Sequence, residues 1–211
     1  MPQAVLVRHG ETEWSRVHRH TGRTDVPLTT AGSEKARLLG PELAEWTFAL
    51  VLTSPLRRAL DTCRLAGYGE VAALRDDLKE WDYGAYEGRT RAEIRAERPG
   101  WSLWTDGVPG GESPDDVGRR ADRIIGEVRA APGDAAIFAH GHILRVLAAR
   151  WIGLTPAEGR LFALDTAAIG VVGYERETTV LARWNLVREM TTSPPTRETS
   201  APDDHVTDKG S

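Results

Sequence analysis

The stretch that decides the fold reads AVLVRHG at residues 4–10. Its apolar run ends abruptly in RHG, and short apolar runs of this kind are typical of strands buried on both faces of a largely parallel sheet. A second run, AAIFA at 135–139, ends in HGH and precedes the apolar-rich segment 143–152, which we expect to be a helix. The order strand, His-Gly turn, helix therefore occurs twice.

The segments between these two runs continue the alternation. We expect further strands at 48–52, 161–164, 169–174 and 179–184. Helices are expected at 31–46, with a kink at Pro41, and from Ser54 to about Leu65. Two more are expected, a short one that begins at Thr90 and ends at Pro99, and one from Ser113 to about Arg129. Ser54-Pro55 and Ser113-Pro114 are each expected to supply an N-cap followed by an N1 proline. Thr90 and Glu93 form a possible capping box. Strands alternating with helices predict an α/β fold.

Composition limits the classes of function. Among 211 residues 40% are hydrophobic, yet no stretch approaches the roughly 18 apolar residues of a membrane span. The net charge of -4 comes from both signs spread along the chain, which favours a small-molecule partner over nucleic acid or a membrane. Residues 1–3 show no basic start to a secretory leader, so we expect a cytoplasmic protein.

One domain is expected over residues 1–190. The pattern is less regular at about 75–112, which we interpret as an insertion or lid. Residues 191–211 offer little apolar surface to offset their ordering entropy, so a disordered tail is expected. Cys63 is the single cysteine, which excludes an internal disulfide and a cysteine-clustered metal site, and it is expected to be a buried, inert thiol.

Two predicted strands end in histidines. Ligands of parallel α/β sheets bind beyond the carboxyl ends of the strands, so His9 and the 140–142 block are expected to meet there. Helix N-termini would add backbone N–H donors, and the guanidinium groups of Arg8 and Arg58 match phosphoryl oxygens. These features predict a phosphate site.

Five separated blocks together resemble the histidine phosphatase superfamily, also called phosphoglycerate mutase-like. They are LVRHGETEW at 6–14, the residues Gly22, Asp25, Leu28, Thr29 and Gly32, SPLRRA at 54–59 with Thr62, Glu80 with YG at 83–84 and EG at 87–88, and HGH at 140–142. Their order and spacing cover about residues 5–184. The resemblance implies a three-layer α/β/α sandwich with a mostly parallel central sheet, and phosphotransfer without a metal or organic cofactor.

The resemblance also implies catalytic roles. His9 would be the nucleophile, whose neutral imidazole attacks phosphorus and forms a phosphohistidine. Arg8, Arg58 and His140 would hold the nonbridging oxygens and stabilise the charge of the transition state. Glu80 would protonate the departing alkoxide and then activate water.

Further positions are implied to bind substrate: Ser15, Thr21, Gly22, Tyr83, Gly141 and His142. Ser15 stands where the mutases commonly carry asparagine and has a shorter reach. Trp81 stands where mutases carry a basic residue, so a strongly basic second subsite is missing and the phosphatase branch is favoured. His18, Arg19 and His20 are expected to form a solvated loop near the pocket mouth, and Arg19 or Arg23 could alternatively meet a second phosphate.

We therefore expect a metal-independent phosphomonoesterase for small phosphorylated metabolites of the sugar phosphate or broad acid phosphatase type, acting as a monomer or homodimer. The alternatives are a 2,3-bisphosphoglycerate-dependent phosphoglycerate mutase and a non-catalytic phospholigand-binding protein. Two site assignments also have rivals. His140 and His142 could form a metal pair, and Glu11 or Glu87 could replace Glu80 as the acid. Trp101 and Trp104 could share one apolar helical edge, either in the core or facing substrate.

Overall fold

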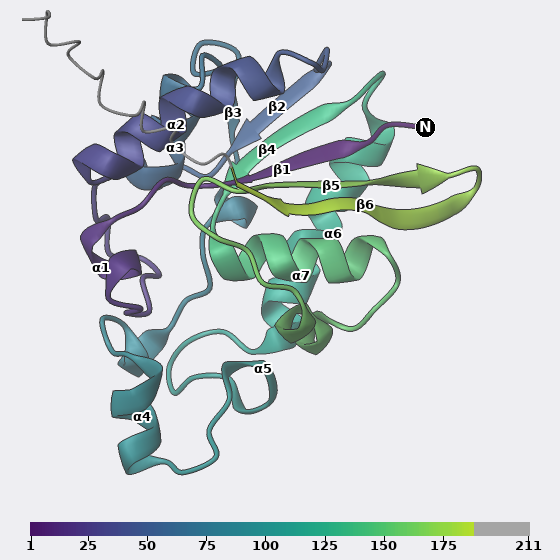
Figure 1. Cartoon of the computed structure of the whole chain (residues 1–211). Helices are drawn as coiled ribbons and strands as arrows, with labels where there is room; N and C mark the ends of the chain where they lie inside the picture. The colour runs from purple at the N-terminus through teal and green to yellow at the C-terminus, as the bar shows by residue number, and fades with distance from the viewer. Residues whose placement is uncertain (188–211) are drawn as a thin grey trace, which may run out of the picture.

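A six-stranded sheet forms the middle of the molecule in the computed structural model, which describes residues 1–187 (Figure 1). Its strand order is β3-β2-β4-β1-β5-β6. The strands are β1 (Ala4–Arg8), β2 (Leu50–Thr53), β3 (Ala73–Leu74), β4 (Ala135–Ala139), β5 (Ile169–Glu175) and β6 (Thr178–Leu186). The first four run parallel to one another, and β5 and β6 are antiparallel additions beside β1. The predicted, mostly parallel sheet is confirmed.

Helices cover both faces of this sheet. Helices α2 (Thr30–Leu43) and α3 (Arg57–Leu65) lie on one face, and α6 (Pro114–Ala130) and α7 (Gly141–Trp151) lie on the other (Figure 1). Alternate residues of β1 enter two separate apolar clusters, one shared with α2 and α3 and the other shared with α6 and α7. Because both faces are buried, the strands are apolar throughout, and the three-layer sandwich is confirmed.

The remaining elements are short. They are α1 (Glu13–Arg16), α4 (Arg91–Glu97), α5 (Leu103–Asp106) and the 3-10 helices η1 (Asp76–Leu78), η2 (Gly84–Tyr86) and η3 (Pro156–Leu161). The chain from η1 to α5 extends away from the sheet at one end of the molecule (Figure 1). A capping box at Thr90 begins α4, and Ser113 caps α6 with Pro114 in its first turn, both as predicted. Ser113 also forms a capping box with Asp116. Within residues 1–187 no helix is long and apolar enough to cross a bilayer. The predicted tail at 191–211 lies outside the described residues.

Three predicted elements are wrong in position or type. Helix α3 begins at Arg57 rather than beside Ser54, because Ser54 still extends β2 through a hydrogen bond from its N–H to Phe138 O (2.9 Å). The expected strand at 161–164 is absent, because a capping box starting at Thr155 turns residues 156–161 into η3 instead. Helix α2 keeps Pro41 inside it and ends at Leu43, short of the predicted end at residue 46.

The loop that follows β1 is fixed by a close approach of two backbones. A Cβ atom on Gly32 would lie 2.2 Å from Glu11 O, and one on Gly10 would lie 2.4 Å from Gly32 O. The N–H of Gly10 also donates to the Thr62 hydroxyl (3.0 Å) on α3. Glycine is therefore required at both positions, and the segment after His9 is tied to α2 and α3.

We expect Gly32→Ala to lower the free energy of unfolding by roughly 2 kcal/mol, since the new methyl group would collide with backbone atoms that cannot rotate away. Gly126→Ala is the matched control, because a Cβ there meets nothing within 4 Å on α6. It should raise the free energy of unfolding by up to about 1 kcal/mol through helix propensity. Urea denaturation measures both changes, and equal stability of Gly32→Ala and the wild type would contradict the close approach.

Candidate active site

Two histidines meet at the carboxyl ends of β1 and β4. The parallel register pairs Arg8 with Ala139, and the N–H of His9 donates to Ala139 O (2.9 Å). The residues that follow each strand, His9 and His140, therefore lie side by side, with ring centroids 5.2 Å apart. The predicted meeting of the two sequence blocks is thus present in the structure.

The hydrogen bonds of His9 define its tautomer. Its Nδ1 lies 2.7 Å from Gly10 O, and because a carbonyl can only accept, Nδ1 carries the proton. Burial, together with the positive charges of Arg58 and Arg8, holds the pKa of His9 well below its ordinary value. The ring is therefore neutral, and its Nε2 atom keeps a lone pair.

His140 has the opposite tautomer. Its Nδ1 accepts a hydrogen bond from Arg58 Nε (3.0 Å), so Nε2 carries the proton and donates to the Ser54 hydroxyl (2.8 Å). Burial and the charge of Arg58 hold the pKa of His140 well below its ordinary value. A guanidinium thus occupies the Nδ1 lone pair that a metal would need. His142 is engaged elsewhere, with Nδ1 2.6 Å from the Tyr83 hydroxyl. In residues 1–187 no group of three or more histidine, cysteine or acidic side chains could hold a metal ion.

Arg58 is fully buried and organises the loop that faces the histidines. Its Nη1 donates to Thr24 O (3.0 Å), and its Nη2 donates to the carbonyls of Thr21 and Gly22 (both 2.9 Å). With the bond to His140, four of its five N–H donors are used within the protein. Arg58 therefore holds the site together as well as supplying charge.

Arg8 has a donor that no residue satisfies. Its Nη1 donates to Leu164 O, while its Nε is buried and has no hydrogen-bond partner in the described part of the chain. The guanidinium lies against Gly141, where a Cβ would come within 3.3 Å of Cζ. A buried N–H without an acceptor costs roughly 1–3 kcal/mol.

Glu80 caps helix α7 from a distant part of the chain. Its Oε2 accepts from the N–H of His142 (2.9 Å), and its Oε1 accepts from those of Ile143 (3.0 Å) and Trp81 (2.9 Å). Burial raises the pKa of the Glu80 carboxyl, but its hydrogen bonds with His142 outweigh burial and hold this pKa well below its ordinary value. The carboxylate is thus ionised in the unliganded protein.

The two rival acids have other partners. The Glu87 carboxylate accepts from the N–H groups of Gly22 and Thr24, and Glu11 accepts from the Thr29 hydroxyl. Neither lines the cavity that contains His9, whereas Glu80 does.

This cavity has a volume of about 180 Å³. Of the predicted substrate-binding residues, it is lined by Ser15, Thr21, Tyr83, Gly141 and His142. Gly22 does not line it: its carbonyl accepts from Arg58, and a Cβ there would lie 2.6 Å from Trp81 O. The Ser15 hydroxyl is engaged with the main chain of Thr12 in the capping box of α1.

Five residues of the cavity wall lie outside the predicted site residues: His18, Arg19 and His20, which were expected near the pocket mouth, and Arg145 and Leu164. His20 is not in a solvated loop, because its Nδ1 lies 2.7 Å from Arg89 O and its ring packs against Tyr83. Arg145 lies over the Trp104 ring (4.6 Å), and burial lowers its pKa to about 10. A signal for Arg145 existed, since it lies three residues after His142 and so on the same face of α7.

A second cavity of about 370 Å³ adjoins the first and shares His20, His142 and Arg145 with it. Arg91 and Arg160 add positive charge there. The expectation that a basic second subsite is missing is therefore wrong, because its arginines come from α4, α7 and η3 rather than from the segment after Glu80.

Trp101 and Trp104 also line this second cavity. They do not share a helical edge, because Trp101 precedes α5 and packs against Tyr86, whereas Trp104 lies within α5 and packs against Trp81. Cys63 is buried, as predicted, and burial raises the pKa of its thiol to about 12.

His9, Arg8 and Glu80 line one small cavity, and Arg58 and His140 lie buried behind it, outside its lining. The sequence pattern of the histidine phosphatase superfamily (branch 1) matches residues 4–187. The chain belongs to this superfamily, and the predicted class of enzyme, a phosphomonoesterase of the histidine phosphatase type, is confirmed.

Curated relatives cover most of the chain. An acid phosphatase of Mycobacterium tuberculosis (strain ATCC 25618 / H37Rv) is 45% identical over 184 residues, which are 84% of this chain and 89% of the relative. A sedoheptulose 1,7-bisphosphatase of Saccharomyces cerevisiae is 36% identical, over 72% of this chain and 68% of the relative. Among solved structures, the open reading frame Rv3214 of Mycobacterium tuberculosis superposes with a TM-score of 0.82 at 42% identity, covering 88% of this chain and 98% of that one.

Imidazole ¹⁵N NMR at pH 6 should report neutral rings, with the proton on Nδ1 in His9 and on Nε2 in His140, because burial and nearby arginines disfavour their protonation. In the urea-unfolded chain the same rings should titrate near the ordinary value of about 6.5. Since the unfolded chain then binds protons that the folded chain does not, the free energy of unfolding should fall as the pH drops below about 6.5. A protonated His9 in the folded protein at pH 6 would contradict this account.

Proposed function

We propose that this chain hydrolyses sugar phosphates and related small phosphomonoesters through a phosphohistidine on His9. The observation that carries the proposal is the pairing of a free Nε2 lone pair on neutral His9 with a buried, unsatisfied Nε–H on neighbouring Arg8. The first is a nucleophile, and the second awaits an anionic oxygen.

In the first step, His9 Nε2 forms a bond to phosphorus while the bond from phosphorus to the ester oxygen breaks. Glu80 gives its proton to the departing alkoxide. In the second step, water attacks the phosphohistidine, Glu80 accepts a proton from that water, and His9 Nε2 is released with its lone pair. Arg8, which lines the cavity, stabilises the charge on the nonbridging oxygens from close by, and Arg58 adds its positive charge from behind His140 without a direct bond to the phosphate.

Glu80 must gain a proton before the first step. Its carboxylate is ionised in the unliganded protein, and a phosphate dianion bound beside it would oppose this negative charge. Like charges at short distance raise the pKa of a carboxyl group. Substrate binding itself would therefore prepare Glu80 to act as an acid.

The second cavity supports substrates with an additional anionic group. Arg145 lines both cavities, and its hydrogen bonds go to the carbonyls of Gly159 and Arg160 rather than to a carboxylate. A sugar whose reacting phosphate lies at His9 could place a second phosphate near Arg145 and Arg91. We therefore propose that sugar bisphosphates are bound more tightly than the corresponding monophosphates.

The same cavity keeps the phosphoglycerate mutase as the second candidate, because a mutase also needs positive charge away from the reacting histidine. A 2,3-bisphosphoglycerate-dependent phosphoglycerate mutase of Gloeobacter violaceus is 34% identical over 75% of this chain. The products distinguish the two candidates, since a mutase yields an isomer and a phosphatase yields inorganic phosphate. A lid at 75–112, a cytoplasmic location and a monomeric or homodimeric state stay predictions.

Phosphate release should be measured from a panel of sugar phosphates, sugar bisphosphates, phosphoglycerates and nucleotides, with a chelator present. We expect chelator-resistant release that His9→Ala reduces by at least about 1000-fold, because the nucleophile is lost. Arg145→Met should raise KM for bisphosphates about tenfold and leave KM for monophosphates unchanged, since one charged contact is removed.

Full activity of His9→Ala would overturn the phosphohistidine. Conversion of 3-phosphoglycerate in the presence of bisphosphoglycerate, without release of phosphate, would instead establish the mutase.

Glu80→Gln should slow sugar phosphate hydrolysis by about 100-fold or more, because an alkoxide needs a proton as it departs. The same variant should slow p-nitrophenyl phosphate much less, since that leaving group departs without a proton. Steady-state kinetics on both substrates gives the ratio. Equal slowing of the two would move the acid role to another residue.

A further inference from the structure

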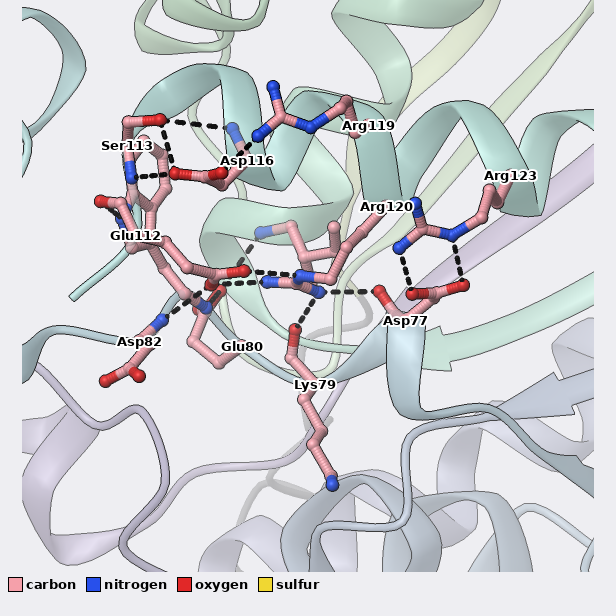
Figure 2. A network of polar contacts seen from close by, with 12 residues as sticks. Asp77, Lys79, Glu80, Asp82, Glu112, Ser113, Asp116, Arg119, Arg120 and Arg123 are labelled. Atoms are coloured by element: carbon pink, nitrogen blue, oxygen red, sulfur yellow. Dashed lines mark hydrogen bonds and ion pairs between the residues drawn. The ribbon is translucent and has the colours of Figure 1, made fainter.

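One ion pair bonds to the backbone on both sides of Glu80 without touching Glu80 itself. Arg120 on α6 forms a two-pronged bond to Glu112, from Nε to Oε1 (2.7 Å) and from Nη2 to Oε2 (2.8 Å) (Figure 2). Its Nη1 donates to the carbonyls of Asp77 (2.6 Å) and Lys79 (2.8 Å). Arg120 therefore fixes the chain that leads into Glu80.

Glu112 fixes the chain that leaves Glu80. Its Oε2 accepts from the N–H of Asp82 (2.9 Å), its own N–H donates to Asp82 O (3.0 Å), and its carbonyl accepts from the Trp81 indole (2.8 Å). We call the Arg120–Glu112 pair, with its bonds to residues 77–82, the loop clamp. The loop clamp holds the backbone around Glu80, and the N-terminus of α7 holds the Glu80 carboxylate.

Packing alone does not hold this loop. A polar cavity of about 210 Å³ lies on the outer side of Glu80 and is lined by Glu80, Glu112 and Arg120 among others. The clamp side chains are largely buried, with exposed fractions of 13% for Arg120 and 22% for Glu112. A buried ion pair is weak evidence for stability, because an apolar pair of similar size often stabilises a fold as well or better. Arg120 also donates to the carbonyls of residues 77 and 79, and these bonds indicate that it positions the loop rather than only stabilising the fold.

We propose that Arg120 is a positioning residue that sets the place of the Glu80 carboxylate for proton transfer, through Glu112 and the backbone of residues 77–82. The proposal rests on the proposed function only where it concerns proton transfer. The groups around the phosphate site come from other elements, namely the ends of β1 and β4 and helix α3. Loss of the clamp should therefore impair proton donation and leave phosphate binding intact.

Arg120→Met removes the clamp and keeps an unbranched side chain. We expect kcat for sugar phosphates to fall about 10- to 100-fold, since displacement of a catalytic group by about 1 Å has effects of this size. Hydrolysis of p-nitrophenyl phosphate should change by less than about threefold, and inhibition by inorganic phosphate should be unchanged. Arg150→Met is the matched control, because Arg150 is also paired through two bonds, to the carboxylate of Asp122, and within the described chain it forms no bond to residues 77–82. It should match the wild type on both substrates.

Amide hydrogen exchange provides a readout that needs no turnover. In Arg120→Met the amides of Trp81, Asp82, His142 and Ile143 should exchange about tenfold faster or more, while those of the central strands β1 and β4 keep their protection. Arg150→Met should leave all of them unchanged. If Arg120→Met does not fold, Glu112→Gln is judged by the same criteria, with a smaller effect in the same direction.

Unchanged exchange at these four amides would overturn the loop clamp. Faster exchange with equal slowing of both substrates would overturn its role in proton transfer. If the wild-type protein releases no phosphate from any substrate, the proposed function fails, and hydrogen exchange alone decides whether Arg120 positions Glu80.

Discussion

The parallel pairing of β1 with β4 is the constraint on which the site depends. The register that aligns Arg8 with Ala139 brings His9 and His140 together without any bond between their side chains. The neighbouring pairing of β2 with β4 brings Ser54 to the Nε2 of His140. A slip of one residue in either pairing would turn the following side chains to the opposite face of the sheet. The buried apolar faces that fix the register thus also fix the catalytic geometry.

Positive charge dominates the centre of the site and explains the state of its histidines. Arg58 is fully buried and Arg8 partly buried beside His9 and His140, so a further positive charge on either ring is disfavoured. The energetic cost of assembling these guanidinium groups is met during folding, before any ligand arrives. A phosphate dianion then enters a field already oriented toward it, which is the arrangement that stabilises transition-state charge most effectively.

Local sequence patterns predicted the structural features that depend on neighbouring residues. They failed for features that depend on contacts between residues far apart in the sequence. The apolar runs of β1 and β4 and the helix cap at Ser113 are local, and each is present. Ser54 has every local feature of a helix cap, yet its hydroxyl bonds to His140, 86 positions away in the sequence. The arginines of the second cavity come from three separate elements, so no single motif could show them. Their convergence became visible only in the folded chain.

The Glu80 carboxylate caps helix α7 and is also the group proposed to transfer a proton. His140, the N-cap of this helix, makes no capping bond with its own side chain, and the helix begins against the Glu80 carboxylate instead. A protonated carboxyl accepts weaker hydrogen bonds than a carboxylate does. In the mechanism proposed for Glu80, each protonation of its carboxyl would therefore weaken the hydrogen bonds that hold the first turn of α7, which carries His142. The stability of that turn would then follow the protonation state of Glu80.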